Sequence, residues 1–349
     1  MDLRYGSADE NVRKRSILDI ILHERQRFEG GREKITGASL PESKDHTGCR
    51  SVSEAALLSP SRAGELAVIS TVNRLAAEKI RAKIFLPVIL LPPGTQEEVL
   101  RELMRQICRT CFADGIEIGQ VRAEVTDAVT RPIVIGTAEG DRFCEDTSSI
   151  ENFAEDFTER EIVVTGPVGL EGTYILVCQE FKVLQERFPM SILTRMRGAG
   201  TELSVLRAAG TAAGAQDICG LPAMVSLGQG GFFAGLWELS RKTGCGLEAD
   251  LQAVPILQET IEITDFCGIN PYSMRSGGSL LIAVRQADQL IRRLEQDGRT
   301  AVKIGKLTGT KDKIIRNGED VRFLDRPQTD SLALAKMQKK GFKILNSKC

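Results

Sequence analysis

The feature that most constrains the fold is a regular interleaving of helical and strand-like apolar patterns in both halves of the chain. From Gly64 onward, apolar residues at spacings of three and four predict a helix, and the run "KIFLPVILL" (83–91) predicts a buried strand. The same succession returns after residue 160, where "EIVVTG" opens a second series of strands and helices. This interleaving predicts two α+β domains, each with helices packed on a sheet.

Two polar stretches set the predicted domain boundaries. The first 60 residues carry charge clusters and a Ser/Pro-rich stretch, with one short helix expected around 15–27. An acidic segment without a clear apolar period, "EDTSSIENFAEDFTERE", separates the two halves. The predicted organisation is an N-terminal helix and loop segment, two domains and a basic C-terminal tail, over residues 1–60, 61–157, 158–330 and 331–349.

Composition narrows the class of ligand. The 46 Lys and Arg residues balance 47 Asp and Glu residues, so the chain lacks the large positive net charge that is typical of nucleic-acid-binding proteins. No run reaches the roughly 18 to 20 apolar residues that span a bilayer. Nine cysteines without a regular framework indicate reduced thiols. We therefore expect a cytosolic protein with a small-molecule ligand, and neither nucleic acid nor membrane as a partner.

A single C-x-x-C, Cys108 and Cys111, lies inside an amphipathic helical pattern. We expect Thr95 to be the N-cap of that helix, with Glu98 three residues later completing a capping box. Neither a second cysteine pair nor a nearby histidine completes a tetrahedral metal site, so the pattern favours core packing for both thiols. The whole chain has two histidines, which also disfavours a Ser-His-Asp triad.

Paired glycines precede a helical apolar pattern in "SLGQGGFFAGLWEL" (226–239). Glycines at a helix N-terminus let backbone N–H groups approach an anion, as in phosphate-binding turns. The short side chains beside Gly230 and Gly231 are Ser226 and Gln229, so the segment offers no carboxylate to hold a metal. Close packing of the helix is the alternative explanation of the glycines.

Three other segments place polar side chains or glycines where predicted helices and strands meet, a common location for ligand groups. Each segment is also consistent with a purely structural role, as a solvated helix face, a surface hairpin or a packing turn. The three are "STVNRLAAEKIRA" (70–82), "GQVRAEVTDAVTRP" (119–132) and "VTGPVGLEGTYILV" (164–177).

The order and spacing of the four segments resemble the aminoimidazole ribonucleotide synthetase superfamily from about residue 60 to 328, and most closely its hydrogenase-maturation carbamoyl dehydratase branch. "NRLAA" stands where that family has N-D-x-A-A, and "LLPPGTQEE" resembles its L-P-x-G-T helix start. "SLGQGG" stands where D-P-T-E-G-G is expected, and "SGGSLLIAV" resembles a late strand. The resemblance implies an α+β first domain for dimerisation and ATP, an α/β second domain, a homodimer, and magnesium held by acidic side chains.

The chain lacks acidic residues at several positions where the resembled family has them. Arg74 replaces the aspartate of the N-D pair, and Ser226 and Gln229 replace two acids of the D-P-T-E-G-G segment. Magnesium prefers carboxylate oxygens, so ATP remains a candidate ligand, magnesium is disfavoured and no metal ligand is assigned. One hypothesis is a pseudoenzyme that binds a nucleotide, another phosphate-bearing molecule or a maturation partner protein. The alternative is an ATP-dependent enzyme for phosphotransfer or amide or carbamoyl dehydration, with Arg74 and Arg122 holding phosphate.

The sequence thus predicts a degenerate nucleotide cleft. Its candidate ligand-binding residues are Asn73, Arg74, Arg122, Ser226, Gln229, Gly230 and Gly231. Glu124 and Asp127 are the candidate catalytic carboxylates. In the resembled branch a cysteine near the C-terminus carries the carbamoyl group within a P-R-I-C motif. Cys349 ends this chain without that motif, so an incidental terminal cysteine is the favoured interpretation.

Overall fold

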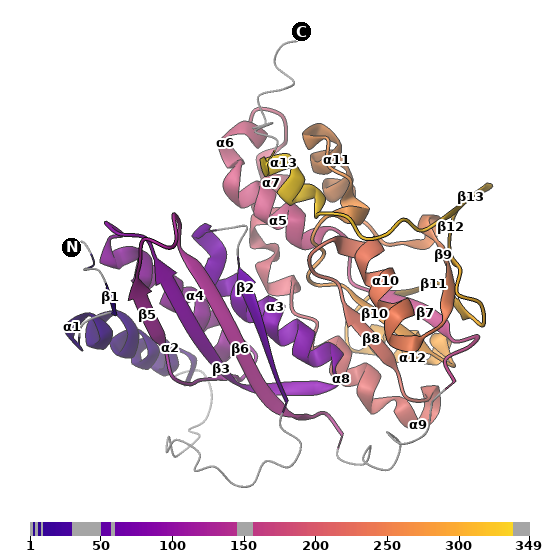
Figure 1. Cartoon of the computed structure of the whole chain (residues 1–349), viewed down its shortest axis with the longest axis horizontal. Helices are drawn as coiled ribbons and strands as arrows, with labels where there is room; N and C mark the ends of the chain where they lie inside the picture. The colour runs from indigo at the N-terminus through magenta and orange to yellow at the C-terminus, as the bar shows by residue number, and fades with distance from the viewer. Residues whose placement is uncertain are drawn as a thin grey trace. The chain divides into compact units, whose positions relative to one another are not determined.

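The computed structural model describes residues 3, 6–7, 10–29, 50–56, 60–144 and 156–337, drawn as ribbon in Figure 1. It divides into two compact units, Met1–Leu75 with Ile80–Arg142, and Ala76–Lys79 with Phe143–Cys349. The predicted boundary at 157/158 falls later than this division, because Phe143 packs against Gly210 and Cys144 against the backbone of Ala213. Cys349 lies outside the described residues.

The first unit is built on a six-stranded sheet of order β1-β5-β3-β6-β2, with β4 paired to β3. The strands are β1 (Gly6–Ser7), β2 (Arg50–Ala56), β3 (Ile80–Leu91), β4 (Glu117–Ile118), β5 (Arg122–Val125) and β6 (Ile133–Arg142). β3 runs parallel to β5 and antiparallel to β6. The predicted strands at 83–91 and 131–140 correspond to β3 and β6.

Two helices, α3 (Ala63–Ala77) and α4 (Glu97–Ala113), pack with one face of this sheet. Thr71 of α3 lies against Gly136 of β6, and the side chains that alternate onto this face, such as Phe85 and Val134, are buried. The other face of β3 and β6 presents half-buried apolar side chains. They are Ile84, Leu86, Val88, Leu90, Ile133 and Ile135.

The capping prediction for α4 is wrong. The helix begins at Glu97 with Gln96 at the N-cap position, and the Gln96 side chain makes no cap hydrogen bond. The Thr95 hydroxyl instead donates to the carbonyl of Pro92 at 2.6 Å. The Thr95 hydroxyl is therefore used within the "PPGT" turn and cannot cap the helix, which starts one residue later than predicted.

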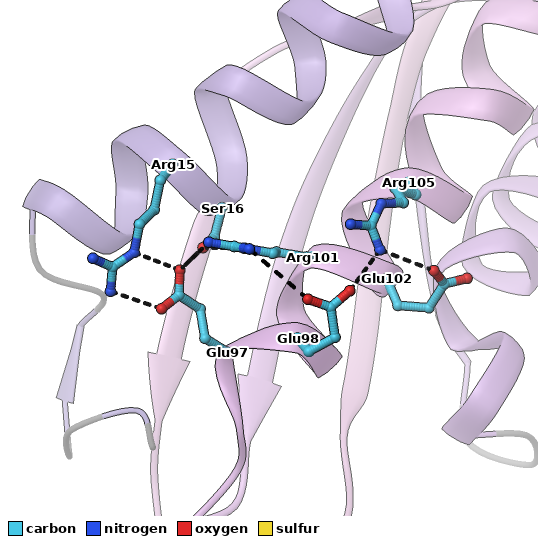
Figure 2. Close-up of polar contacts among 7 residues, drawn as sticks. All are labelled: Arg15, Ser16, Glu97, Glu98, Arg101, Glu102 and Arg105. Atoms are coloured by element: carbon cyan, nitrogen blue, oxygen red, sulfur yellow. Dashed lines mark hydrogen bonds and ion pairs between the residues drawn. The ribbon is translucent and has the colours of Figure 1, made fainter. Parts of the chain in front are cut away.

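The predicted N-terminal helix is present as α1 (Glu10–Arg13), a π-helical turn (Lys14–Leu18) and α2 (Asp19–Glu29). The π-helical turn and α2 pack along α4. Their link is Glu97, which is buried (Figure 2). Its carboxylate accepts hydrogen bonds from Arg15 Nε and Nη2 at 2.6 and 2.7 Å, and from the Ser16 hydroxyl. Arg101 Nη2 donates at 3.0 Å. Hydrogen bonding from Arg15 lowers the pKa of Glu97 to about 2, so this carboxylate is a charged anchor for the N-terminal segment.

The second unit contains a seven-stranded sheet of order β13-β12-β9-β11-β7-β10-β8. β12 and β9 are parallel and the other neighbours are antiparallel. The strands are β7 (Glu161–Thr165), β8 (Ala223–Ser226), β9 (Gly246–Asp250), β10 (Leu280–Val284), β11 (Ala301–Thr308), β12 (Lys313–Asn317) and β13 (Asp320–Phe323). The expected strands at "EIVVTG", "SGGSLLIAV" and "TAVKIG" are β7, β10 and β11.

Helices of this unit bury apolar stripes, which for α10 are Phe232, Leu236 and Leu239 against β-strand residues such as Leu281 and Leu247. The α-helices are α5 (Leu170–Gln179), α6 (Phe181–Leu184), α7 (Met190–Gly198), α8 (Leu206–Gly214), α9 (Gln216–Cys219), α10 (Gly231–Thr243), α11 (Gln258–Cys267), α12 (Ala287–Gln296) and α13 (Ser331–Met337). Single 3₁₀ turns lie at Pro60–Arg62, Ala199–Glu202, Leu251–Ala253 and Pro271–Ser273. Within the part of the chain that the structure describes, no helix is both long enough and apolar enough to cross a membrane.

Candidate functional site

Five of the nine predicted site residues belong to the first unit. Asn73 is buried in α3, whereas its neighbour Arg74 is exposed and forms an ion pair with Glu54 of β2 at 2.7 Å. Arg122 and Glu124 alternate onto one face of β5 and pair with each other at 3.0 Å. The fifth residue, Asp127, is exposed just beyond the end of β5.

Within one chain the structure does not bring Arg74 and Arg122 together. Glu54, the partner of Arg74, is opposite Gly136 in the β2–β6 ladder and so lies on the face covered by α3. Arg122 is aligned with Val88 of β3, whose side chain is on the opposite face. The two arginines are thus separated by the thickness of the sheet and by strands β3 and β6.

The four residues of the second unit follow β8. Ser226 ends the strand, Gln229 is exposed, and Gly230 is the N-cap of α10 in the left-handed conformation, with φ of 79°. Gly231 has φ of 65°, and a Cβ there would lie 2.3 Å from the carbonyl oxygen of Met274. Both explanations of the glycine pair, an anion-binding turn and close packing, therefore have a basis. Gly230 adopts the left-handed conformation of such a turn, and Gly231 lets the helix pack closely against the Met274 backbone.

A carboxylate does stand at this turn, and the sequence reasoning missed it. Asp330 is 1% exposed, and its Oδ2 accepts a hydrogen bond from the backbone N–H of Gly230 at 2.8 Å. Its Oδ1 accepts from the N–H of Leu332 at 3.0 Å, which caps the start of α13. Burial raises the pKa of Asp330, whereas the Gly230 N–H and the charge of Arg275 oppose that rise.

A second buried carboxylate, Glu171, lies near the same turn. It follows the left-handed Gly169 at the start of α5 and is paired with Arg275, whose Nε is 2.8 Å from Oε1. The N–H of Gly277 donates to Oε2 at 3.0 Å. The segment 272–277 that supplies these donors also packs against Gly231. A glutamate directly after a glycine turn was visible in "VGLEG", but its arginine partner 104 residues later had no local signal.

A cavity of about 320 Å³ borders the turn within the second unit. Gly230 and Phe233 line one side, and the segment that follows β13 lines the other. Arg322 and Arg326 contribute to the lining, and neither has an ion-pair partner among the residues the structure describes, although Arg322 lies over the Phe233 ring. The lining thus has two arginines against one carboxylate, Asp325, and includes the Phe233 ring. This excess of positive charge beside an aromatic ring suits an anion that carries a planar group.

The donor set around this cavity does not fit magnesium. Ser226 and Gln229 supply no carboxylate, and Asp330 uses both oxygens on backbone N–H groups. The cavity lining adds a single carboxylate, that of Asp325. Across the described ranges, no group of three or more His, Cys, Asp or Glu residues could hold a metal ion. Cys108 and Cys111 are buried in α4, and burial raises the pKa of Cys108 to about 12. They are core thiols, as the sequence predicted.

Comparison with known proteins identifies a domain in the second half of the chain. Residues 161–317 match the family described as AIR synthase related protein, C-terminal domain. This stretch is therefore an AIR synthase-related C-terminal domain. Carbamoyl dehydratase HypE of Escherichia coli strain K12 is 25% identical over 279 residues, which span 77% of each protein.

Solved structures show that the chain has the two-domain AIR synthase-like fold that the sequence predicted. The crystal structure of E. coli HypE superposes with a TM-score of 0.68 at 20% identity, over 91% of this chain and all of the other. A structure of HypE in complex with ATP gives 0.67 at 14% identity, over 92% and 95% of the two chains. A HypE–HypF complex gives 0.64 at 15% identity, over 82% and 92%.

The match to the AIR synthase related C-terminal domain ends at residue 317. It therefore includes Glu171, Arg275 and the Gly230–Gly231 turn, but neither Asp330 nor the two cavity arginines. The carboxylate at the turn comes from a part of this chain that follows the matched domain.

Proposed function

We propose that this AIR synthase-related protein is a maturation-factor-like protein that binds an anionic, phosphate-bearing ligand, with ATP the first candidate, at the Gly230–Gly231 turn without a magnesium-dependent reaction. The observation that carries the proposal is the Asp330 carboxylate on the N–H of Gly230. A turn that already binds one oxyanion has the donor geometry to bind another. Arg322 and Arg326 add positive charge at the adjoining cavity.

Loss of the metal-dependent reaction is supported by the replaced acids. Ser226 and Gln229 leave the turn without the carboxylates that a magnesium–phosphate site uses. Glu124 is paired with Arg122 in the first unit, which gives this carboxylate a structural partner. The alternative in which Arg74 and Arg122 clamp one phosphate has no support within one chain, since they lie on opposite faces of the sheet.

Relatives support the choice of ligand and partner. One similar structure is HypE in complex with ATP, and another is a HypE–HypF complex. By analogy, we propose a nucleotide as ligand and a maturation protein as partner for this chain. The seven cysteines recorded within the described residues are all free thiols, which is consistent with the reducing cytosol that we propose as its location.

A homodimer is also part of the proposal. The face of the first sheet opposite α3 and α4 presents the half-buried apolar side chains of β3 and β6, including Leu86, Val88 and Ile135. Apolar sheet faces are normally packed against another layer, and a second copy of the chain would supply one. Sedimentation of the wild type and of Val88→Lys tests this part: a dimer that the substitution dissociates supports it, and a wild-type monomer refutes it.

The test of the function is calorimetric titration of the full chain with ATP, with and without magnesium. We expect binding of similar strength in both buffers, and weaker binding by Arg326→Gln. Tight binding only with magnesium would refute the metal-independent site. Hydrolysis of ATP by the wild type would refute the loss of reaction, whereas its gain in Arg74→Asp/Ser226→Asp would support loss of two family acids.

A further inference from the structure

The segment that lies over the Gly230–Gly231 turn is held at both ends. We define the C-terminal strap as residues 324–332, which lead from β13 to α13 and pass over α10 in Figure 1. Leu324 is buried in the core of the second unit and Leu332 is completely buried. Between them, Trp237 of α10 donates its indole N–H to the carbonyl of Asp325.

Asp330 is the polar contact of the strap with the turn. One oxygen accepts from Gly230 and the other from Leu332, so the same carboxylate fixes the turn and the start of α13. A phosphate oxygen that takes the Gly230 N–H has to replace the Asp330 oxygen, because one N–H cannot make two full hydrogen bonds at the same place. Two anions in the same buried position would also repel each other.

We propose that the C-terminal strap is an autoinhibitory latch, in which the Asp330 carboxylate occupies the anion position of the Gly230–Gly231 turn and is released when a phosphate-bearing ligand binds. This inference rests on the proposed function and adds its regulation. The strap also forms one side of the cavity, through residues such as Pro327 and Thr329. Release of Asp330 therefore opens both the N–H donor and the adjoining space. The apparent affinity equals the affinity of the open form multiplied by the fraction of molecules in which the latch is open, so a mostly closed latch weakens binding.

Substitutions at Asp330 separate its two hydrogen bonds. In Asp330→Ser the hydroxyl can still cap α13 at the Leu332 N–H, but the shorter neutral side chain cannot occupy the Gly230 position as a carboxylate does. Asp330→Asn keeps the shape and removes the charge. Asp320→Asn is the matched control, because it removes a negative charge from an exposed position of β13, outside the cavity lining, while leaving the Asp330 contacts in place.

Affinity is the first measurement. Titration with ATP, and separately with inorganic phosphate, is expected to give a Kd about tenfold lower for Asp330→Ser than for the wild type, since a charge-assisted hydrogen bond no longer competes. We expect a smaller gain for Asp330→Asn and none for Asp320→Asn. Equal ATP affinities in the wild type and in both Asp330 variants overturn the latch and leave the binding function standing. No binding of either ligand by any variant overturns the binding function, and the latch with it.

Two readouts on the wild type do not depend on a variant that folds. Trp237 is the single tryptophan of the chain and contacts the strap, so saturating ATP is expected to change its fluorescence. Hydrogen exchange should become faster at the amides of Leu332 and Leu334, which donate to the side chain and carbonyl of Asp330. ATP binding without faster exchange at these two amides overturns the latch.

Discussion

The carboxylate of Asp330 accepts a hydrogen bond from the backbone N–H of Gly230, a residue 100 positions earlier in the sequence. The turn that lacks acids in its own segment thus has an acid supplied by the strap after β13. This relationship changes how the missing family acids are understood. Ser226 and Gln229 offer no carboxylate to a metal, whereas Asp330 supplies one that binds backbone donors and needs no metal.

The left-handed turn should tolerate no side chain at its second glycine. Gly231 has φ of 65°, and a Cβ would lie 2.3 Å from the Met274 carbonyl oxygen and 2.8 Å from that of Tyr272. Both partners are backbone atoms that cannot move aside easily. We expect Gly231→Ala to lower the free energy of unfolding by roughly 2–4 kcal/mol, measured by chemical denaturation.

Gly228→Ala is the matched control for that substitution. A Cβ at Gly228 meets no atom within 4 Å, and its φ is not in the left-handed region. We expect a change of no more than about 0.5 kcal/mol in the control. Equal destabilisation by the two alanines would contradict the close approach at Gly231.

The buried pair of Glu171 and Arg275 should be sensitive to removal of one partner. Glu171 is 3% exposed and has Arg275 and the Gly277 N–H as its donors. Arg275→Gln leaves the carboxylate buried without a compensating charge, which costs about 3–5 kcal/mol. Thermal and urea unfolding would measure this loss, and the double variant with Glu171→Gln should recover part of it.

An exposed pair provides the comparison. Lys306 and Glu159 are paired at 2.7 Å, with side chains that are 49% and 63% exposed. Solvent screens such a pair, so Lys306→Gln should leave the free energy of unfolding nearly unchanged. A loss as large as that of Arg275→Gln would show that burial does not distinguish the two pairs.

The sequence predicted the two-domain fold because the period of apolar residues is a local property. It also identified the glycine turn, whose local chemistry is visible in "GQGG". It could not predict that Asp330 would meet Gly230, since contacts between distant segments depend on the sheet that brings them together. The placement of Arg74 and Arg122 on opposite faces depends in the same way on strand register, which one sequence does not specify. The error at Thr95 has another cause, because two local hydrogen bonds competed for one hydroxyl.

The α4 thiols should be inert in the folded protein. Burial raises the pKa of Cys108 to about 12 and that of Cys111 well above its ordinary value, and the thiolate is the reactive form. We therefore expect iodoacetamide at pH 8 to leave both residues unmodified in the native protein and to label them in urea. Mass spectrometry of the peptide that contains both thiols would measure this. Rapid native labelling would contradict core packing of the C-x-x-C.

The N-terminal helices should detach more easily in acid, because their anchor is the charged form of Glu97. The pKa of this carboxyl is lowered from about 4.5 to about 2 by Arg15, Ser16 and Arg101, so the stabilisation is complete above pH 4.5 and is lost as pH falls toward 2. At neutral pH it amounts to roughly 3 kcal/mol at most. Glu97→Gln should lower the free energy of unfolding by up to that amount at pH 7 and by much less at pH 3. Glu98→Gln is the control, since that side chain is 63% exposed and should have little effect at either pH. Urea unfolding at the two pH values measures the difference, and a pH-independent effect of Glu97→Gln would show that shape rather than charge holds the N-terminal helices on α4.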